Sequence, residues 1–283
     1  MSEFLLDAVV AECRRDAGME SPQQEPQPGY QPSPLVPWHP DDATVIPNEL
    51  VRCALFRVAD PASRREPCHG RRLPVQAARN GYIEYTGEEL RQDDRRVFMH
   101  ALHREAATPG TATFKPRRFC EDIGWGTSNV AYDKLIETLS RLKATSLLMF
   151  LPRIAPAGVA VSLIARWGFV PDSGSIRVCF DPEIRALFRD QHYTRILRIY
   201  EDQLTRRSYL ASWLLGFYAS HREPIAFPLD RLQGLCGDST PRKEFRRKAS
   251  LALQQLVDIG FLESFSIQDA SVACRRVLSL PAP

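Results

Sequence analysis

The chain has 283 residues, of which 44% are apolar and 25% charged, and its formal net charge is +3. This composition is typical of a folded protein with a real core, and no apolar run approaches the roughly 20 residues needed to cross a bilayer. Residues 1–45 hold two basic and eight acidic residues, net −6, whereas residues 46–283 hold 35 and 26, net +9. A basic body favours a polyanionic partner such as nucleic acid, and a solvated basic surface is the equal alternative.

The cysteines stand singly, without a CxxC pair, so neither a zinc ribbon nor a disulfide framework is indicated. They have the pattern of small apolar residues in a reducing cytosol, at positions 13, 53, 68, 120, 179, 236 and 274. The first residues are acidic, unlike a secretory signal. We therefore expect a cytoplasmic protein that is not bound to a membrane.

Residues 1–45 are predicted to be a flexible, acidic leader rich in proline and glutamine. Residues 3–16 have apolar residues at the spacing of a short amphipathic helix. Residues 17–47 have the proline- and glutamine-rich composition of an extended linker. Such a helix is either an arm that binds a partner or a helix that packs on the body. Residues 60–74 are predicted to be an exposed basic loop.

The next segments are regular. Strands are predicted at 82–86 and 112–114, and a helix at 91–106. Pro116 begins a short helix to residue 123, and Thr127 or Ser128 caps a longer helix to about residue 144. Two apolar runs, 146–151 and 159–165, predict a β-hairpin.

The same order follows a second time. A strand is predicted at 176–180, a short helix after Pro182, and helices at 193–201 and 205–220. A short helix at 229–235 ends at Gly237, and Pro241 opens a longer helix to about Ile259. Strands at 261–267 and 274–280 close the chain, joined by a turn at residues 268–269.

Each copy of short helix, tight turn, longer helix and β-hairpin has the order of a helix-turn-helix with a wing. We therefore predict an α+β fold that is mainly helical, with two tandem winged-helix domains after a disordered leader. The expected domains are the leader at 1–45, an N-terminal winged helix at 46–168 and a C-terminal winged helix at 169–283.

The longer helix of the second copy begins with a dense set of cations. Such a helix enters the major groove while its neighbour contacts the DNA backbone. Because cations at a helix N-terminus oppose the helix dipole, their presence favours a role in binding phosphates or guanine edges over a merely solvated face. Ser239 and Thr240 are suited to cap the helix or bind phosphate.

In the first copy, the short helix carries arginines that are suited to bind phosphate. The longer helix begins with polar residues, among them an asparagine that can hydrogen-bond to adenine. Wing arginines are equally well explained as plain surface charge. The candidate DNA contacts of both copies are Arg117, Arg118, Thr127, Ser128, Asn129, Lys134, Arg141, Arg153, Ser239, Thr240, Arg242, Lys243, Arg246, Arg247, Lys248 and Arg275.

No enzyme motif accompanies these residues. The sequence has no GxxxxGK[ST] loop for a nucleotide, no HExxH and no cluster of carboxylates of the kind that holds catalytic metals. We expect no enzyme activity, no cofactor and no bound metal.

Several segments resemble the TrfA family of plasmid replication initiators, namely ALFRDQHYTRI, SWLLGFYASHREP, LDRLQGLCG, IPNELVRCALF, IEYTGEELRQDD and LSRLKA. The resemblance covers about 46–280 and is specific in combination. It implies two winged helices, with reading helices at 128–143 and 241–258, that bind direct repeats (iterons) at a plasmid origin.

The resemblance also implies opening of an adjacent AT-rich duplex, contact with its single strands, and recruitment of the host initiator, replicative helicase and sliding clamp. It implies active monomers and dimers that restrain copy number. The leader departs from the family, because it lacks a clamp-binding sequence of the Gln-Leu-x-Leu-Phe kind. A dimeric winged-helix repressor that regulates its own gene is the alternative, and a protein-interaction module is a third class.

Overall fold

The computed structural model describes residues 43–60, 63–76, 81–105, 110–188, 192–204, 207–221 and 226–277. The predicted helix at 3–16 and nearly all of the predicted linker lie outside these residues. The last residues of that linker are a strand rather than an extended tether. Strand β1 (Ala43–Pro47) is buried along its whole length and pairs with β11 (Tyr193–Leu197).

The first structural unit, which we call the N-terminal repeat, runs helix, strand, helix, helix, strand, strand. Its elements are α3 (Gln92–His103), β6 (Thr111–Phe114), α4 (Pro116–Asp122), α5 (Asn129–Lys143), β9 (Ile164–Val170) and β10 (Ser175–Phe180). The strands form an antiparallel sheet in the order β6-β10-β9. Helix α5 forms as its spacing predicts, since Leu135, Leu139 and Leu142 are buried on one side.

The C-terminal repeat has the same order of elements. It consists of α8 (Tyr209–Ala219), β12 (Phe227–Pro228), α9 (Leu229–Cys236), α10 (Arg242–Asp258), β13 (Leu262–Gln268) and β14 (Ser271–Arg276). Its sheet order, β12-β14-β13, matches that of the N-terminal repeat strand for strand. Gly237 ends α9 with φ +70°, the left-handed conformation that the sequence predicted there.

The predicted division between the two copies is wrong at strand β10. We expected this segment to open the second copy, but it pairs with β6 and β9 and completes the first sheet. The expected boundary between residues 168 and 169 falls inside β9. The predicted helix at 193–201 is also wrong at its start, because β11 precedes the short α7 (Arg198–Glu201).

The predicted hairpin at 146–165 forms, but in a different sheet. Strands β7 (Ser146–Leu151) and β8 (Ala155–Val161) join β3 (Pro67–Pro74) and β4 (Tyr82–Glu88) in the order β3-β4-β7-β8. Only β7 and β8 of this sheet lie between α5 and β9 in the chain, and β9 and β10 occupy the hairpin position of the N-terminal repeat. Residues 67–74, expected in a loop, are the edge strand β3.

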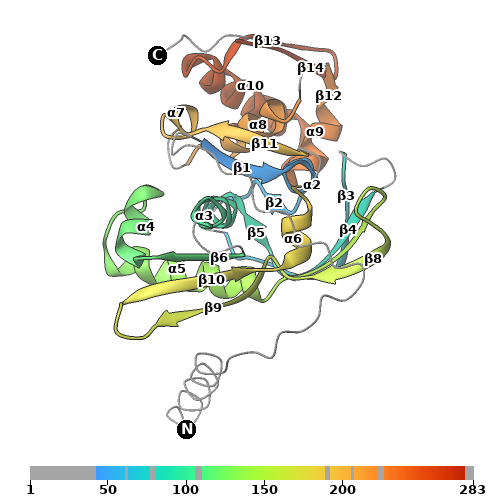
Figure 1. Ribbon diagram of the computed structural model, residues 1–283. Coiled ribbons are helices and arrows are strands. Elements are labelled where there is room, and N and C mark those ends of the chain that lie inside the picture. The colour runs from blue at the N-terminus through green and yellow to red at the C-terminus, as the bar shows by residue number, and fades with distance from the viewer. Residues whose placement is uncertain are drawn as a thin grey trace. The chain divides into compact units, whose positions relative to one another are not determined.

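Several short elements lie outside both repeats. They are α2 (Asn48–Val51), the parallel pair β2 (Phe56–Arg57) and β5 (Leu90–Arg91), and α6 (Pro182–Ala186). Strand β1 contacts α3 and its partner β11 contacts α8, as Figure 1 shows. Buried side chains from both repeats form one continuous core. With strands about as extensive as helices in the described part, the fold is mixed rather than mainly helical.

Candidate nucleic-acid interface

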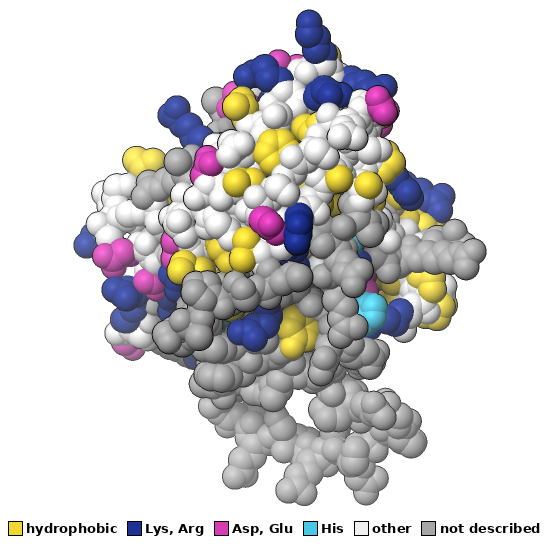
Figure 2. Space-filling model, turned by 90° about the horizontal axis from the view of Figure 1, so that it is seen from above, with side chains coloured by type: hydrophobic (Ala, Val, Ile, Leu, Met, Phe, Trp, Pro, Cys, Tyr) yellow, Lys and Arg dark blue, Asp and Glu magenta, His cyan; other side chains and the backbone are white. Residues whose placement is uncertain are grey.

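Helix α10 has an apolar face and a cationic start. Phe245, Ala249 and Leu253 are fully buried against the repeat, which leaves the opposite face of the first two turns to solvent. Four cations on that face are exposed, namely Arg242, Lys243, Arg246 and Arg247. Figure 2 views the molecule from the side of α10 and shows Lys and Arg side chains projecting at several places along the edge.

Two of these cations have weak, exposed partners. Arg242 Nε lies 3.0 Å from a carboxylate oxygen of Asp230, and both side chains are 59% exposed. Arg247 pairs with Glu244 one turn away at 2.6 Å. Exposed pairs of this kind contribute little to stability because solvent screens them, so a phosphate can displace them at little cost. Lys243 has no ion pair with any residue that the structure describes.

Arg246 connects α10 to its hairpin. Its guanidinium donates hydrogen bonds to the carbonyl oxygens of Asp269 (2.8 Å) and Ile267 (3.0 Å), at the turn between β13 and β14. Asp269 has φ 51°, which a tight turn requires. Arg246 therefore positions the hairpin beside the helix, a role that the sequence pattern did not indicate.

Asp238 organises the turn before α10. Its carboxylate accepts hydrogen bonds from the Thr240 N–H (2.8 Å), the Thr240 hydroxyl and Lys248 Nζ (2.8 Å). Burial raises the pKa of Asp238, but the hydrogen bonds from Lys248 and Thr240 outweigh burial and lower it overall. Thr240 and Lys248 thus hold the turn, while Ser239 is exposed at its tip.

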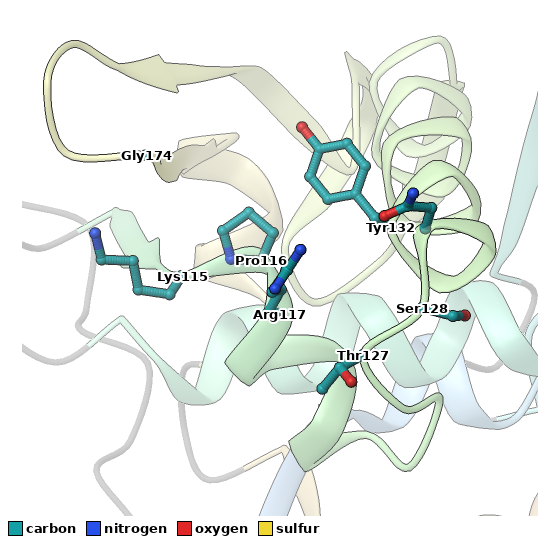
Figure 3. Close-up of a pocket in the computed structure, with 8 residues that line it drawn as sticks. Lys115, Pro116, Arg117, Thr127, Ser128, Tyr132 and Gly174 are labelled. Atoms are coloured by element: carbon teal, nitrogen blue, oxygen red, sulfur yellow. The ribbon is translucent and has the colours of Figure 1, made fainter.

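The N-terminal repeat forms a hollow of about 370 Å³ between the starts of α4 and α5 and the turn of its hairpin. Lys115, Arg117, Thr127, Asn129 and Gly174 are among its lining residues. Figure 3 shows Lys115 and Arg117 at the start of α4, Thr127 before α5 and Gly174 in the hairpin turn. Ser128 caps α5, because its hydroxyl accepts the Ala131 N–H at 3.2 Å. Arg118 instead pairs with Glu121 and Asp122 of its own helix.

Two predicted contacts on α5 are paired with carboxylates of the protein. Lys134 lies 3.0 Å from Asp93 and over the ring of Trp125. Arg141 pairs with Asp94 at 2.6 Å and with Glu88 at 2.9 Å, and only 10% of its side chain is exposed. The prediction that Arg141 reaches the DNA backbone is wrong, because the buried Asp94 and the partly exposed Glu88, about 50 positions earlier in the chain, hold its guanidinium.

The wing arginines differ between the repeats. Arg153 lies in the turn between β7 and β8, not in a wing, and its guanidinium contacts Glu49 at 2.8 Å and the Leu187 carbonyl. The prediction that placed it in a wing is therefore wrong. Arg275 does lie in the second hairpin, 74% exposed, and pairs with Glu263 across the strands.

The hairpin β9–β10 carries exposed residues that the sequence analysis did not select. Phe169 is 59% exposed and packs edge-on against Trp167, and Arg166 and Arg177 are exposed on the same two strands. Val130, 77% exposed, lies in the first turn of α5. The alternation in IARWGFV and SIRVCF, separated by a PDSG turn, was the signal that identifies this hairpin.

Within the described ranges, no group of three or more His, Cys, Asp and Glu side chains is arranged to hold a metal ion. No described helix has the length and hydropathy of a membrane span. Cys53, Cys68, Cys120 and Cys236 are buried as free thiols, and burial raises the pKa of Cys53 and Cys236 to about 12.

A profile described as TrfA protein matches residues 10–276. The plasmid replication initiator protein TrfA of Escherichia coli is 32% identical over 252 residues, which are 86% of this chain and 64% of that protein. The crystal structure of domains 2 and 3 of RctB is similar in fold, with a TM-score of 0.55 and 14% identity, covering 82% of this chain and 98% of that one. The Pi initiator protein in complex with iteron DNA covers 66% of this chain and 92% of that one at 14% identity, and its TM-score of 0.49 is too low for a conclusion about this chain.

Proposed function

The chain belongs to the TrfA protein family, and on that basis we propose that it is a sequence-specific, double-stranded-DNA-binding initiator of plasmid replication. It binds direct repeats at the origin, promotes local opening of the duplex and brings in host replication proteins. The chain spans 64% of the length of its Escherichia coli relative. We therefore propose, on the basis of this similarity, that it shares the role of that protein in replication initiation.

The observation that carries the proposal is the duplicated unit. Each repeat places a helix with a polar or cationic start beside a two-stranded hairpin, α5 with β9–β10 and α10 with β13–β14. We interpret both as winged helices, in which the second helix of the helix-turn-helix enters the major groove and the hairpin lies along the adjacent backbone. Two such units suit a site that spans consecutive grooves.

In the C-terminal repeat, affinity would come mostly from phosphate contacts. Lys243 and Arg247 on the exposed face of α10 are placed to neutralise phosphates or to bond guanine O6 and N7. Arg246 holds the hairpin against α10, so the helix and wing present one surface. Ser239 at the exposed tip of the preceding turn is a further phosphate donor.

In the N-terminal repeat, finer sequence reading is expected. Asn129 begins α5 on the exposed side of the hollow, and a carboxamide can bond adenine N6 and N7. Val130 beside it offers an apolar contact to a thymine methyl group. Arg117 and Thr127 line the same hollow and suit the flanking phosphate backbone.

Opening of the duplex would use binding energy to deform DNA rather than nucleotide hydrolysis, and the protein would have no enzyme activity of its own. We further propose that it acts in the cytoplasm and contacts the host initiator and helicase. An equilibrium of active monomers with dimers would restrain copy number.

The test is footprinting on the DNA next to the encoding gene, with permanganate to detect unpaired thymines. Protection of direct repeats with permanganate reactivity in an adjoining AT-rich segment, in the presence of host initiator, is the expected result. Protection of a single inverted repeat without unpaired bases would instead support the dimeric repressor. The double variant Lys243→Ala/Arg247→Ala should lose the footprint, whereas Arg72→Ala, on β3 outside both repeats, should keep it.

A further inference from the structure

A group of charged side chains lies between the reading helices of the two repeats. We call it the arginine–carboxylate cluster, and its members are Arg57, Arg65, Arg91, Lys134, Arg141, Glu88, Glu89, Asp93 and Asp94. Most of these side chains are nearly excluded from solvent. Its members come from β2, the loop before β3, the region around β5, the start of α3 and the helix α5.

One end of the cluster holds α5 at two points. Lys134 binds Asp93 at 3.0 Å, and Arg141 binds Asp94 at 2.6 Å. The two cations are seven residues apart, about two helical turns, so these contacts restrain both the position and the rotation of α5. Asp94 is completely buried, and an unpaired charge there would be costly.

The middle of the cluster joins these aspartates to Glu89. Arg65 binds Asp94 at 2.6 Å and Asp93 at 3.1 Å, and it also donates to the Glu89 backbone carbonyl at 2.7 Å. The Glu89 carboxylate in turn accepts from Arg91 Nε at 2.6 Å. With only 5% of its side chain exposed, Glu89 has a fixed position.

The other end reaches the C-terminal repeat through Arg57. Its Nη1 binds the Glu89 carboxylate at 2.6 Å, while its Nε (3.0 Å) and Nη2 (2.8 Å) both donate to the carbonyl oxygen of Gly237. Gly237 is the left-handed residue between α9 and α10, and a Cβ there would lie 2.8 Å from Arg57 Cγ. The next residue, Asp238, binds Lys248 of α10.

From this unbroken series of contacts we propose that the cluster fixes the two reading helices relative to each other, and that Arg57 is the positioning residue that sets the spacing between the DNA sequences they recognise. The inference rests on the proposed function. Arg57 acts through Gly237 and needs no contact with DNA, since only 13% of its side chain is exposed.

The consequence for recognition is geometrical. One extra base pair between the sequences read by α5 and α10 moves one of them by about 3.4 Å and turns it by about 35°. A rigid connection cannot follow that change without losing contacts in one groove. Without the Arg57 contacts the repeats could change their relative position. Affinity for a target with the correct spacing would then fall, and a change of spacing would reduce affinity by a smaller factor than in the wild type.

The first experiment measures binding to targets with one base pair inserted or removed at each position of the protected site. We expect the wild type to lose about tenfold or more in affinity at insertions between the two recognised sequences, comparable to a mismatched base pair. Arg57→Ala should bind the natural target more weakly. On the same insertions it should lose less than about threefold in affinity relative to its own natural target, which corresponds to about 0.7 kcal/mol. An unchanged spacing preference would overturn the proposal.

The matched control is Arg104→Ala. Arg104 also pairs with a partly buried aspartate, Asp122, but both residues belong to the N-terminal repeat. It should keep the wild-type spacing preference. If Arg57→Ala does not fold, Glu89→Gln serves in its place, because it removes the charge that holds Arg57 and leaves the backbone carbonyls intact.

The second experiment needs no DNA. Spin labels introduced as unnatural amino acids at Glu137 of α5 and Gln254 of α10, both exposed, report the distance between the helices by pulsed electron resonance. We expect one narrow distribution in the wild type and in Arg104→Ala, and a broadened one in Arg57→Ala. Equal widths would refute the coupling even if the chain binds DNA, and a failure to bind DNA with a broadened distribution would refute only the proposed function.

Discussion

Gly216 of α8 lies so close to Arg95 of α3 that a Cβ atom at position 216 would be 2.9 Å from Arg95 Nη1. The same atom would be 2.9 Å from a methyl group of Val51. Arg95 is buried and donates to the backbone carbonyl and the hydroxyl of Ser212, one turn earlier in α8. Burial lowers the pKa of Arg95 to about 10. A glycine in the middle of a helix thus allows the first helices of the two repeats to meet through a buried guanidinium.

Gly216→Ala should therefore destabilise the protein. Alanine gains roughly 1 kcal/mol in helix propensity, but the added methyl group overlaps Arg95 and Val51, and overpacking typically costs about 1–3 kcal/mol. We expect a net loss in the free energy of unfolding, measured by urea denaturation. Gly234→Ala is the matched control, because position 234 is in helix α9 and a Cβ there meets nothing within 4 Å. The control should be neutral or slightly stabilising, and equal behaviour of the two variants would contradict the packing argument.

Arg141→Ala should weaken folding rather than DNA contact. Removal of the guanidinium leaves Asp94 fully buried with one partner fewer, and breaking a buried pair costs on the order of 3 kcal/mol. Burial and the neighbouring Asp93 already raise the pKa of Asp94. Denaturation should show the loss, while DNA affinity measured well below the melting temperature should fall much less than in Lys243→Ala/Arg247→Ala. A large loss of affinity without loss of stability would restore Arg141 as a DNA contact.

The salt dependence of DNA binding should identify the phosphate contacts on α10. Each phosphate neutralised contributes about 0.9 to the slope of log affinity against log salt. Lys243→Ala/Arg247→Ala should therefore reduce the slope by about 2, measured by fluorescence anisotropy between low and moderate salt. In contrast, Arg72→Ala should leave the slope as it is. A double variant with the wild-type slope would exclude these two side chains from the interface.

Stability should fall in mild acid because of His100. Burial, followed by nearby Arg198 and Arg96, lowers the pKa of this histidine to about 3 in the folded chain. In the unfolded chain the histidine has its ordinary pKa near 6.5. Between pH 6.5 and pH 3 it is therefore protonated in the unfolded chain but neutral in the folded chain. The free energy of unfolding should therefore decrease as pH falls below 6.5, by up to about 1.4 kcal/mol per unit.

The check is urea denaturation at pH 7.5 and 5.5 of wild type and His100→Gln. The variant should lose part of the difference between the two pH values. The remainder is expected from His221, whose pKa is also lowered by burial, although its hydrogen bond to the Phe217 carbonyl opposes this. An identical pH dependence in both proteins would rule out His100 as its source.

Local sequence patterns predicted many of the elements correctly. The helical spacing of Leu135, Leu139 and Leu142 located α5, and Pro116 marked the start of α4. Gly237 marked the left-handed end of α9, and the cations after Pro241 are exposed along α10 as expected. These signals depend on neighbours within one or two turns, so they are visible without any knowledge of the fold.

Strand partners were not predictable in the same way. An apolar run at 146–151 is compatible with any sheet, and only the folded chain assigns it to β4 and β8 and gives the hairpin position of the N-terminal repeat to β9 and β10. The same holds for residues 43–47, whose burial depends on pairing with β11, about 150 residues later. Pairing between distant strands leaves little trace in the local pattern.

The sequence by itself determined that a short helix, a turn and a longer helix occur twice and that the second longer helix begins with cations, because helical periodicity and charge order are local properties. Only the tertiary structure decided which cations are available. Arg141 pairs with Asp94, which is 47 positions away in the sequence, and Arg153 pairs with Glu49, which is 104 positions away. Lys243 is exposed to solvent. The sequence around an arginine on a predicted helix does not show whether its guanidinium will pair with a buried carboxylate, since burial and ion pairing arise only when distant segments of the chain pack together.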